Sequence, residues 1–241
     1  MTKQEFYQIC TDSFAKNGLS AYATPKYLEK FYDLMVFMLE PNKKMNLTAL
    51  RDEHSVISRH ITDCLLAAKH LPETFPQGRG KLLDVGSGGG MPALPFAIIR
   101  PDIIITALDA TAKKTAYILS AAEHLGLSNV KILTGRAEEL GTDKAYRETF
   151  DIVCARAVAE LRILMEWCVP FIKNGDIELA NAQNAMKKLS CRLELDEICT
   201  LFEEENGDIL TSERHNFIFK KMKPTDKLYP RRNAQITKNP L

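Results

Sequence analysis

The segment from Leu83 to Pro92 (LDVGSGGGMP) constrains the fold more than any other part of this 241-residue chain. It joins a short apolar run, 81–85, to an apolar stretch of helical character that reaches Ile99. A glycine-rich turn between a strand and a helix lets backbone N–H groups approach a ligand closely, because no Cβ intervenes. In open α/β sheets, ligands bind at this carboxyl edge. The segment therefore predicts an α/β fold with a ligand site beside the glycines.

The spacing of the glycines separates two classes of nucleoside cofactor. The dinucleotide fingerprint G-x-G-x-x-G, counted from Gly86, needs a third glycine where this chain has Met91. The pattern D-V-G-x-G-x-G instead resembles motif I of S-adenosylmethionine-dependent methyltransferases. A carboxylate about twenty residues further on, Asp109, ends the next predicted strand and can accept hydrogen bonds from ribose hydroxyls, as both classes require. The remaining alternative is a turn that binds no cofactor, with Asp109 capping the next helix.

Strand and helix patterns alternate after the turn. Apolar runs predict strands at 103–109, 130–134 and 150–155. Helical spacing predicts helices at 112–125 and 161–172. This alternation predicts a mostly parallel sheet with helices on both faces, the Rossmann-like fold of class I S-adenosylmethionine-dependent methyltransferases. Beyond residue 175 the pattern weakens, and only 216–220 predicts a late edge strand.

The first 80 residues are predicted to form an N-terminal helical extension. Apolar residues recur at helical spacing within 6–14, 28–39 and 54–71. Residues 72–80 hold two prolines and two glycines, which is typical of a connector. We therefore divide the chain into the extension 1–80, an S-adenosylmethionine-binding methyltransferase domain 81–223 and a basic C-terminal tail 224–241.

The charge of the chain is patterned although its net value is only +1. Residues 191–213 contain eight acidic side chains and one arginine, whereas residues 214–241 contain eight Lys and Arg and one aspartate. Either these blocks are solvated faces that pair with each other, or the basic one binds nucleic acid. Net charge alone therefore does not exclude a nucleic-acid partner.

The six cysteines and five histidines predict no metal site, because no pair of cysteines forms a CxxC and no histidine cluster accompanies them. Small buried thiols are the expected state. The longest apolar run, 34–39, is far too short to span a membrane. No secretory signal precedes it, so we expect a cytoplasmic protein without a membrane partner.

Further site candidates lie at the ends of later strands and in the extension. Ala137 and Glu138 lie in the loop after the third strand. In methyltransferases of this class that loop flanks the adenine, although Glu138 could equally cap the next helix. Arg156 ends the fourth strand and is expected to contact a ligand or backbone at the active edge. His60 and Asp63, three residues apart on a predicted helix, are candidates for positioning roles, with a purely structural role favoured.

Taken together, several segments resemble the RsmG (GidB) family, the bacterial small-subunit ribosomal RNA guanine-N7 methyltransferases. In the extension they are Asn46-Leu47-Thr48-Ala49 and Arg59-His60 through Asp63. In the core they are LDVGSGGGMPALP, LDATAKK, NVKILTGRAEE and FDIVCARAVAEL. In the tail they are Lys223-Pro224-Thr225, Tyr229-Pro230-Arg231-Arg232 and Lys238-Asn239-Pro240-Leu241. Motif I alone is shared by many methyltransferases, whereas the combination is specific.

The resemblance implies methyl transfer from S-adenosylmethionine to N7 of a single guanine in the 530 loop of 16S ribosomal RNA. It implies a substrate within the small ribosomal subunit, and we expect a monomer. The implied cofactor contacts, with the motif I and ribose acids included, are Asp84, Gly86, Gly88, Met91, Asp109, Ala137, Glu138 and Arg156. The implied RNA contacts are Lys223, Lys227, Arg231 and Arg232. No catalytic acid or base is evident.

Two alternatives stay open, and the first of them rests on a departure from the family pattern. Family members usually carry a Lys-Gly pair at the end of the fifth strand, where this chain has Asn181 and Ala182. The chain could therefore be a catalytically weakened cofactor-binding RNA module. It could also be a methyltransferase for a small molecule or a protein, which would share the cofactor residues without needing the basic tail.

Overall fold

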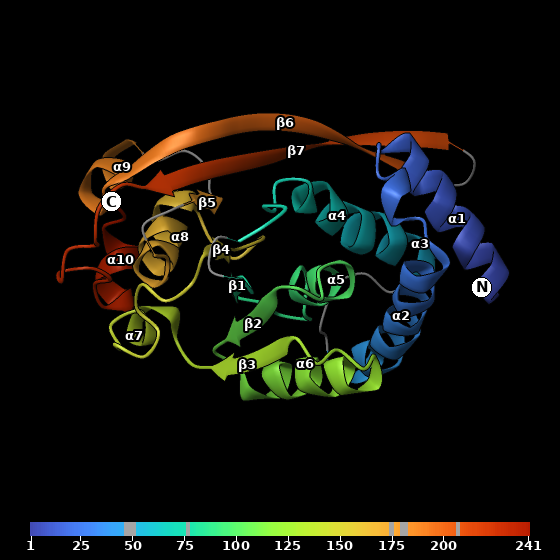
Figure 1. The fold of residues 1–241 in the computed structure, drawn as a ribbon, viewed down its shortest axis with the longest axis horizontal. Coiled ribbons are helices and arrows are strands. Elements are labelled where there is room, and N and C mark those ends of the chain that lie inside the picture. Colours follow the sequence, from blue (N-terminus) through green and yellow to red (C-terminus); the bar gives the residue numbers. More distant parts are fainter. Residues whose placement is uncertain (46–51, 76–77, 174–175, 179–182, 206–207) are drawn as a thin grey trace.

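The computed structural model describes residues 1–45, 52–75, 78–173, 176–178, 183–205 and 208–241. Its centre is a parallel sheet of four strands in the order β3-β2-β1-β4 (Figure 1). The strands are β1 (Lys81–Val85), β2 (Ile104–Asp109), β3 (Val130–Thr134) and β4 (Ile152–Cys154). All four lie within the predicted runs. The prediction of a parallel Rossmann-like sheet is confirmed.

A second sheet continues the first one. It contains β5 (Asp176–Glu178), β6 (Cys191–Glu205) and β7 (Asp208–Lys221), in the order β5-β7-β6 with antiparallel pairing. A parallel bridge between Phe150 and Ile172 links the approaches to β4 and β5. The two sheets thus adjoin between β4 and β5, with β3 and β6 at their outer ends.

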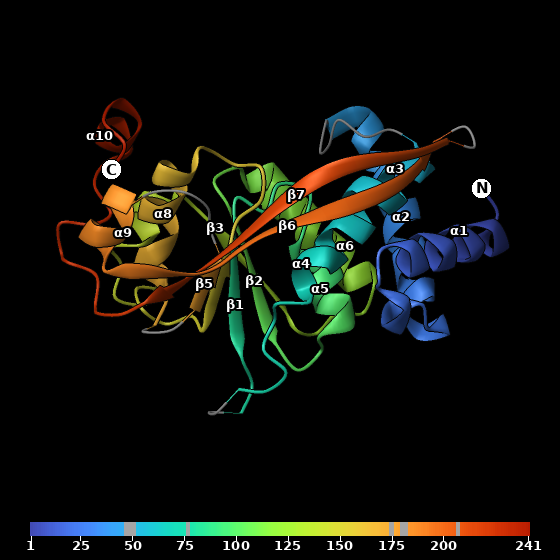
Figure 2. The ribbon, with the colours of Figure 1, turned by 90° about the horizontal axis from the view of Figure 1, so that it is seen from above.

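The prediction of a short edge strand at 216–220 was wrong in extent and in position, because these residues belong to β7, which lies between β5 and β6. β6 and β7 form a long hairpin that runs across the molecule (Figures 1 and 2). A register shift between Leu193 and Leu195 breaks the alternation. Beyond this shift, Glu203 is buried whereas Ile198 is exposed. The polarity of a side chain in β6 therefore does not indicate whether it points to the interior or to solvent. The alternation of polar and apolar residues that marks a strand is therefore masked.

Alternating side chains of the sheet enter two hydrophobic cores. Leu82, Ile105 and Ala107 belong to one core, and Leu83 and Val153 belong to the other. This period of two is the geometry of a strand covered on both faces. The helices of the first core are α1 (Lys3–Lys16), α2 (Pro25–Met45), α3 (Glu53–Val56), α4 (Asp63–Ala68), α5 (Ala93–Ile99) and α6 (Ala112–His124). On the other side are α7 (Ala137–Leu140), α8 (Leu161–Cys168), α9 (Gln183–Leu189) and α10 (Asn233–Lys238).

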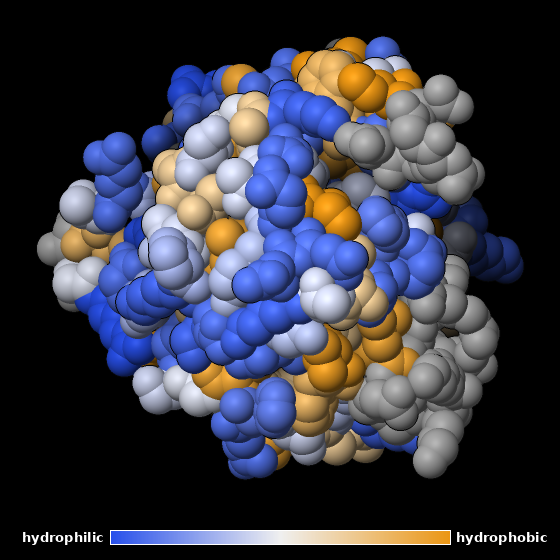
Figure 3. All heavy atoms as spheres, turned by 90° about the vertical axis from the view of Figure 1, so that its right-hand side faces the viewer, coloured by the Kyte–Doolittle hydropathy of each residue, from blue (hydrophilic) through white to orange (hydrophobic). Residues whose placement is uncertain are grey.

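The N-terminal helices also hold the far end of the hairpin. The Asn17 amide donates to the carbonyl of Phe202 and accepts from its N–H, at 3.1 and 3.0 Å. Leu201 of β6 is fully buried in the core of the helical extension. The outer face of these helices is mostly hydrophilic, with scattered hydrophobic side chains (Figure 3). The extension therefore packs on both the sheet and the hairpin; the predicted division at residues 80 and 223 stays a prediction.

The predicted helix at 54–71 is interrupted by a π-helical segment, Ile57–Thr62, between α3 and α4. Such segments widen a helix by one residue per turn and are frequent at functional sites. This one carries Arg59 and His60, while Asp63 begins α4.

The acidic and basic blocks pair mainly with other parts of the chain. Glu203 of the acidic block pairs with Arg59 at 2.7 Å. Among the basic residues, Lys221 pairs with Glu148 at 2.6 Å, and its side chain is fully buried. One described ion pair, His215 with Asp196, joins the two blocks. Mutual pairing is therefore not what holds most of these described charges.

The tail is folded against the body. Arg147 donates to the carbonyls of Thr225, Asp226 and Tyr229, and Leu241 is buried in the second core. In the described part of the chain, no helix is long and apolar enough to cross a membrane.

Candidate cofactor and acceptor site

A cavity of about 340 Å³ lies at the glycine-rich turn. Its lining residues are Met38, His60, Gly86, Ser87, Gly88, Gly89, Met91, Asp109, Lys114, Arg156, Ala157 and Val158. The structure thus brings Gly86, Gly88, Met91, Asp109 and Arg156 of the predicted cofactor set together. It adds His60 from the helical extension, which the sequence left as a positioning candidate.

Gly86 cannot be another residue without local change. Its N–H and that of Ser87 both donate to the carbonyl of Leu108, which ties the turn to β2 at 2.8 and 2.9 Å. Its φ is +76°, and a Cβ there would lie 2.7 Å from Val158 Cγ2. The glycine therefore permits both the left-handed backbone and the close approach of the segment after β4.

Asp109 is held in place for ligand binding. One oxygen accepts from the Gly88 N–H at 3.0 Å and the other from the Thr111 N–H at 2.8 Å. A carboxylate oxygen has two lone pairs, so each can accept one further hydrogen bond. The side chain can thus receive two vicinal hydroxyl groups while its backbone partners fix its orientation.

The structure places Asp84 beneath the turn instead of in the cavity. Its carboxylate is buried, accepts from the Ala93 N–H at the start of α5, and is not among the lining residues. Burial raises its pKa to about 6. Ala137 and Glu138 begin α7 and do not line the cavity either.

Arg156 connects the cofactor cavity to the helical extension. Its Nη1 donates to Asp63 Oδ2 at 2.6 Å and to the carbonyl of Arg59 at 3.1 Å. Its Nη2 lies 3.3 Å from His60 Nδ1. Burial and the neighbouring guanidinium lower the pKa of His60 to about 4. His60 is therefore neutral near pH 7 and adds no positive charge to the cavity.

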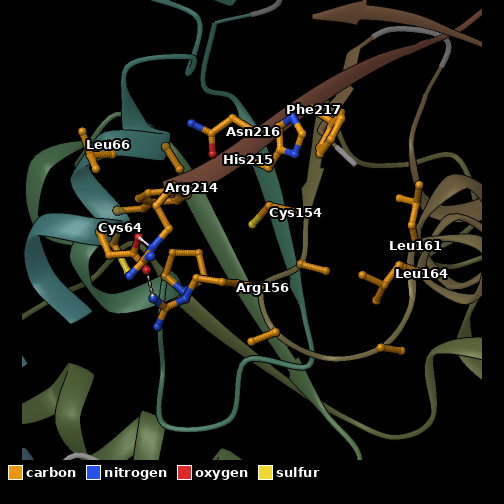
Figure 4. A pocket seen from close by; sticks show the side chains of 17 residues that line it. Cys64, Leu66, Cys154, Arg156, Leu161, Leu164, Arg214, His215, Asn216 and Phe217 are labelled. Atoms are coloured by element: carbon orange, nitrogen blue, oxygen red, sulfur yellow. Dashed lines mark hydrogen bonds and ion pairs between the residues drawn. The ribbon is translucent and has the colours of Figure 1, made fainter. Parts of the chain in front are cut away.

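A second cavity of about 310 Å³ shares Arg156 and Ala157 with the lining of the first. Figure 4 shows the side chains that line this second cavity. Its described lining is largely apolar and includes Leu66, Phe96, Leu164 and Phe217. Three polar residues of β7 also line it, namely Arg214, His215 and Asn216. Sequence reasoning missed Arg214, since nothing in its local sequence marks it as different from the rest of the basic block.

The predicted RNA contacts divide into two kinds. Arg231 donates from Nε and Nη2 to the two carboxylate oxygens of Glu166, at 2.8 and 2.7 Å, and Glu166 is fully buried. This guanidinium therefore holds the tail on α8. Lys223, Lys227 and Arg232 are exposed.

Two parts of the sequence prediction cannot be compared with the structure, namely the departure from the Lys-Gly pair and the segment that begins at Asn46. Asn181, Ala182 and the segment 46–49 lie outside the described residues. In the ranges that the structure describes, no cluster of His, Cys, Asp or Glu could hold a metal ion.

The lining of the first cavity fits S-adenosylmethionine. The backbone of the glycine-rich turn leaves room that a Cβ at Gly86 would fill. Asp109 offers acceptors for the ribose hydroxyls, and neutral His60 does not oppose a cationic sulfonium. Met91 and Val158 add apolar surface.

Comparisons with known proteins agree with this reading. Residues 27–215 match the model of the GidB family, described as rRNA small subunit methyltransferase G. The chain is 35% identical to Ribosomal RNA small subunit methyltransferase G of Brevibacillus brevis, with all of both chains covered. It is 36% identical to the protein of that name from Lactococcus lactis subsp. cremoris, again over both full lengths. Among solved structures, a precorrin-6y C5,15-methyltransferase from Geobacter metallireducens aligns with a TM-score of 0.48 at 14% identity, covering 66% of this chain and 87% of that one.

The family model covers the central parallel sheet and most of the extension, and the match to the Brevibacillus brevis protein covers the tail as well. The chain therefore belongs to the ribosomal RNA small subunit methyltransferase G (GidB) family, and it is an rRNA methyltransferase whose cofactor is S-adenosylmethionine.

Proposed function

We propose that the chain methylates N7 of a single guanine in the 530 loop of 16S ribosomal RNA, within the small ribosomal subunit and as a monomer. The observation that carries the choice of N7 concerns the two groups that could act as a base among the described residues lining the second cavity, Asp63 and His215. His215 Nε2 is engaged by Asp196 at 2.8 Å, and Asp63 is the one carboxylate among these described lining residues. Both of its oxygens are engaged by arginines. N7 of guanine carries no proton, so its methylation needs no general base, unlike that of an amino group.

The chain's own residues then act by positioning and electrostatics. When bound, S-adenosylmethionine supplies an electrophilic methyl group on a sulfonium. Asp109 orients the ribose, and the turn at Gly86 seats the backbone against the cofactor. The largely apolar second cavity holds the flat acceptor base and excludes water.

The exposed cations of the tail support the choice of RNA as partner. The tail packs beside α7, which begins three residues after β3 ends and so lies at the carboxyl edge of the sheet. Pro230 is in contact range of Gly141 there. In this proposal the exposed Lys223, Lys227 and Arg232 contact phosphates of the RNA.

The direct test is transfer of tritiated methyl groups to small ribosomal subunits that lack the modification, with free 16S RNA as the parallel substrate. The proposal expects incorporation into one guanine of the 530 loop, recovered as 7-methylguanine, and more of it with subunits than with free RNA. Label in another base or position, or in ribosomal protein only, would contradict it. RNA binding without transfer would identify the weakened module instead.

A further inference from the structure

Asp63 receives two guanidinium groups that come from distant parts of the chain. Its Oδ2 accepts from Arg156 Nη1 and its Oδ1 from Arg214 Nε, both at 2.6 Å. The aspartate side chain is 12% exposed and each arginine is 29% exposed. Such short, charge-assisted bonds are stronger than neutral ones and restrict the direction of each guanidinium.

The two arginines lie side by side, with Asp63 bonded to both (Figure 4). Arg156 lines both cavities, whereas Arg214 lines only the second one. Arg214 also donates from Nη1 to the Ser212 hydroxyl and the Glu213 carbonyl. Among the described residues, its Nη2 has no acceptor assigned to it. The Asp63 carboxylate thus orients Arg156, which lines the cofactor cavity, and Arg214, which lines the second cavity.

Without that carboxylate the arrangement would not persist. Two like charges held close together repel each other, and a partly buried guanidinium without a partner bears a desolvation cost. A cationic cofactor beside them would add a third positive charge. Neutralising Asp63 therefore affects both cavities, even though the residue lines only the second one.

We infer that Asp63 is a positioning residue for methyl transfer, which fixes Arg156 on the cofactor side and Arg214 on the acceptor side. The acceptor half of this inference rests on the proposed function. The cofactor half does not, because cofactor binding can be measured without RNA.

The test is the near-isosteric variant Asp63→Asn, alone and combined with Arg214→Gln. Asp63→Asn should weaken binding of S-adenosylmethionine, measured by calorimetry without RNA, about tenfold. Its single-turnover rate on unmodified subunits should fall by about two orders of magnitude, with KM for the subunit changed much less. Arg214→Gln should lower the rate while leaving the cofactor Kd unchanged. The double variant should be no slower than the slower single one, because the two residues act as a unit.

Glu203→Gln is the matched control. Glu203 also ties the hairpin to the π-helical segment, through Arg59, yet it lines neither cavity. Because the Ser212 hydroxyl, which accepts from Arg214, donates to Glu203 at 2.9 Å, the readout of this control is the cofactor Kd, which should equal that of the wild type. Equal losses of cofactor affinity in Glu203→Gln and Asp63→Asn would show that both residues merely tether the hairpin, and would overturn the inference.

Two further outcomes separate the hypotheses. Asp63→Glu keeps the charge, so it should keep the cofactor Kd but lose rate, and it serves if Asp63→Asn does not fold. The inference would be overturned if Asp63→Asn kept the wild-type cofactor Kd and rate. It would also be overturned if Asp63→Glu weakened cofactor binding as much as Asp63→Asn does. If the wild type transfers no methyl group to RNA, the proposed function fails, while the Kd comparison still decides the cofactor half.

Discussion

At the scale of single residues, the site depends on positions where an added Cβ atom or an added charge would change the geometry. Gly86 has no Cβ where Val158 approaches, and His60 carries no positive charge beside Arg156. Asp84 is a carboxylate with almost no exposure beneath the turn. Two of these positions give predictions that can be checked without RNA.

Gly86→Ala should weaken cofactor binding at least about tenfold, since a side chain there is strained at positive φ and collides with Val158. Calorimetric titration with S-adenosylmethionine measures the effect. Gly126→Ala is the control, because Gly126 has φ +62° but open space around its Cβ position. It should cost about 1–2 kcal/mol in the free energy of unfolding and leave the cofactor Kd unchanged. An equal Kd in both variants would contradict the packing argument.

Asp84→Asn should change how stability depends on pH. The pKa of Asp84 in the folded chain is raised to about 6 by burial, above its ordinary value. The protonated Asp84 therefore adds to the free energy of unfolding at pH values below the pKa of the unfolded chain. This stabilisation is lost as the pH rises through 6. Between pH 4 and pH 7 the wild type should lose about 2 kcal/mol in the free energy of unfolding relative to Asp84→Asn. Urea unfolding of the cofactor-free protein measures it, and parallel pH curves would contradict the buried, unpaired state.

At the scale of elements, the long hairpin is the part of the fold that most needs support from elsewhere. β6 pairs along one side only, with β7, so its other edge presents unpaired backbone groups. The Asn17 amide occupies that edge at Phe202 like a short piece of strand. The helical extension thereby protects the edge strand as well as covering the sheet.

Asn17→Ala should lower the free energy of unfolding by about 1–3 kcal/mol, because it leaves the N–H and carbonyl of Phe202 without these partners. Hydrogen exchange at the Phe202 amide should accelerate. Asn17→Asp is the comparison, since it keeps an acceptor for the Phe202 N–H and loses the donor. Unchanged exchange in Asn17→Ala would mean that β6 does not depend on this contact.

At the scale of the whole molecule, the net charge of +1 does not distinguish two kinds of cation, those in ion pairs within the fold and those exposed on the tail. Arg214, Lys221 and Arg231 hold the hairpin and the tail through buried or half-buried carboxylates. The exposed cations of the tail are the ones that we propose contact RNA. Replacing Arg231 would therefore disturb the tail's docking on Glu166, so it is not a clean test of RNA binding.

The triple variant Lys223→Ala, Lys227→Ala and Arg232→Ala should bind unmodified small subunits more weakly at low salt. Its dependence of log Kd on log salt concentration should flatten by about 2–3 units, since each lost phosphate contact removes about 0.7–0.9. S-adenosylmethionine affinity should stay the same. The matched control removes three exposed charges elsewhere, Lys26, Arg79 and Lys131. An equal change of slope in both triples would show that the tail is not the RNA-facing surface.

The sequence by itself determined the parallel sheet, the glycine-rich turn and the class of cofactor. These depend on periodicity within single strands and helices and on turn chemistry at Gly86, which neighbouring residues encode. The match of Gly86, Met91 and Asp109 to one cavity follows, because the carboxyl ends of adjacent parallel strands must meet at one edge.

Only the tertiary structure decided which charges face each other. Asp63 and Arg214 are 151 residues apart and meet because the hairpin crosses the helical extension. Arg231 holds Glu166, although the sequence predicted that it would contact RNA. Ion pairs carry no sequence period, since any carboxylate can pair with any cation that the fold brings within reach. The local pattern therefore identifies the cofactor, and the long-range packing selects the side chains that surround its reaction partner.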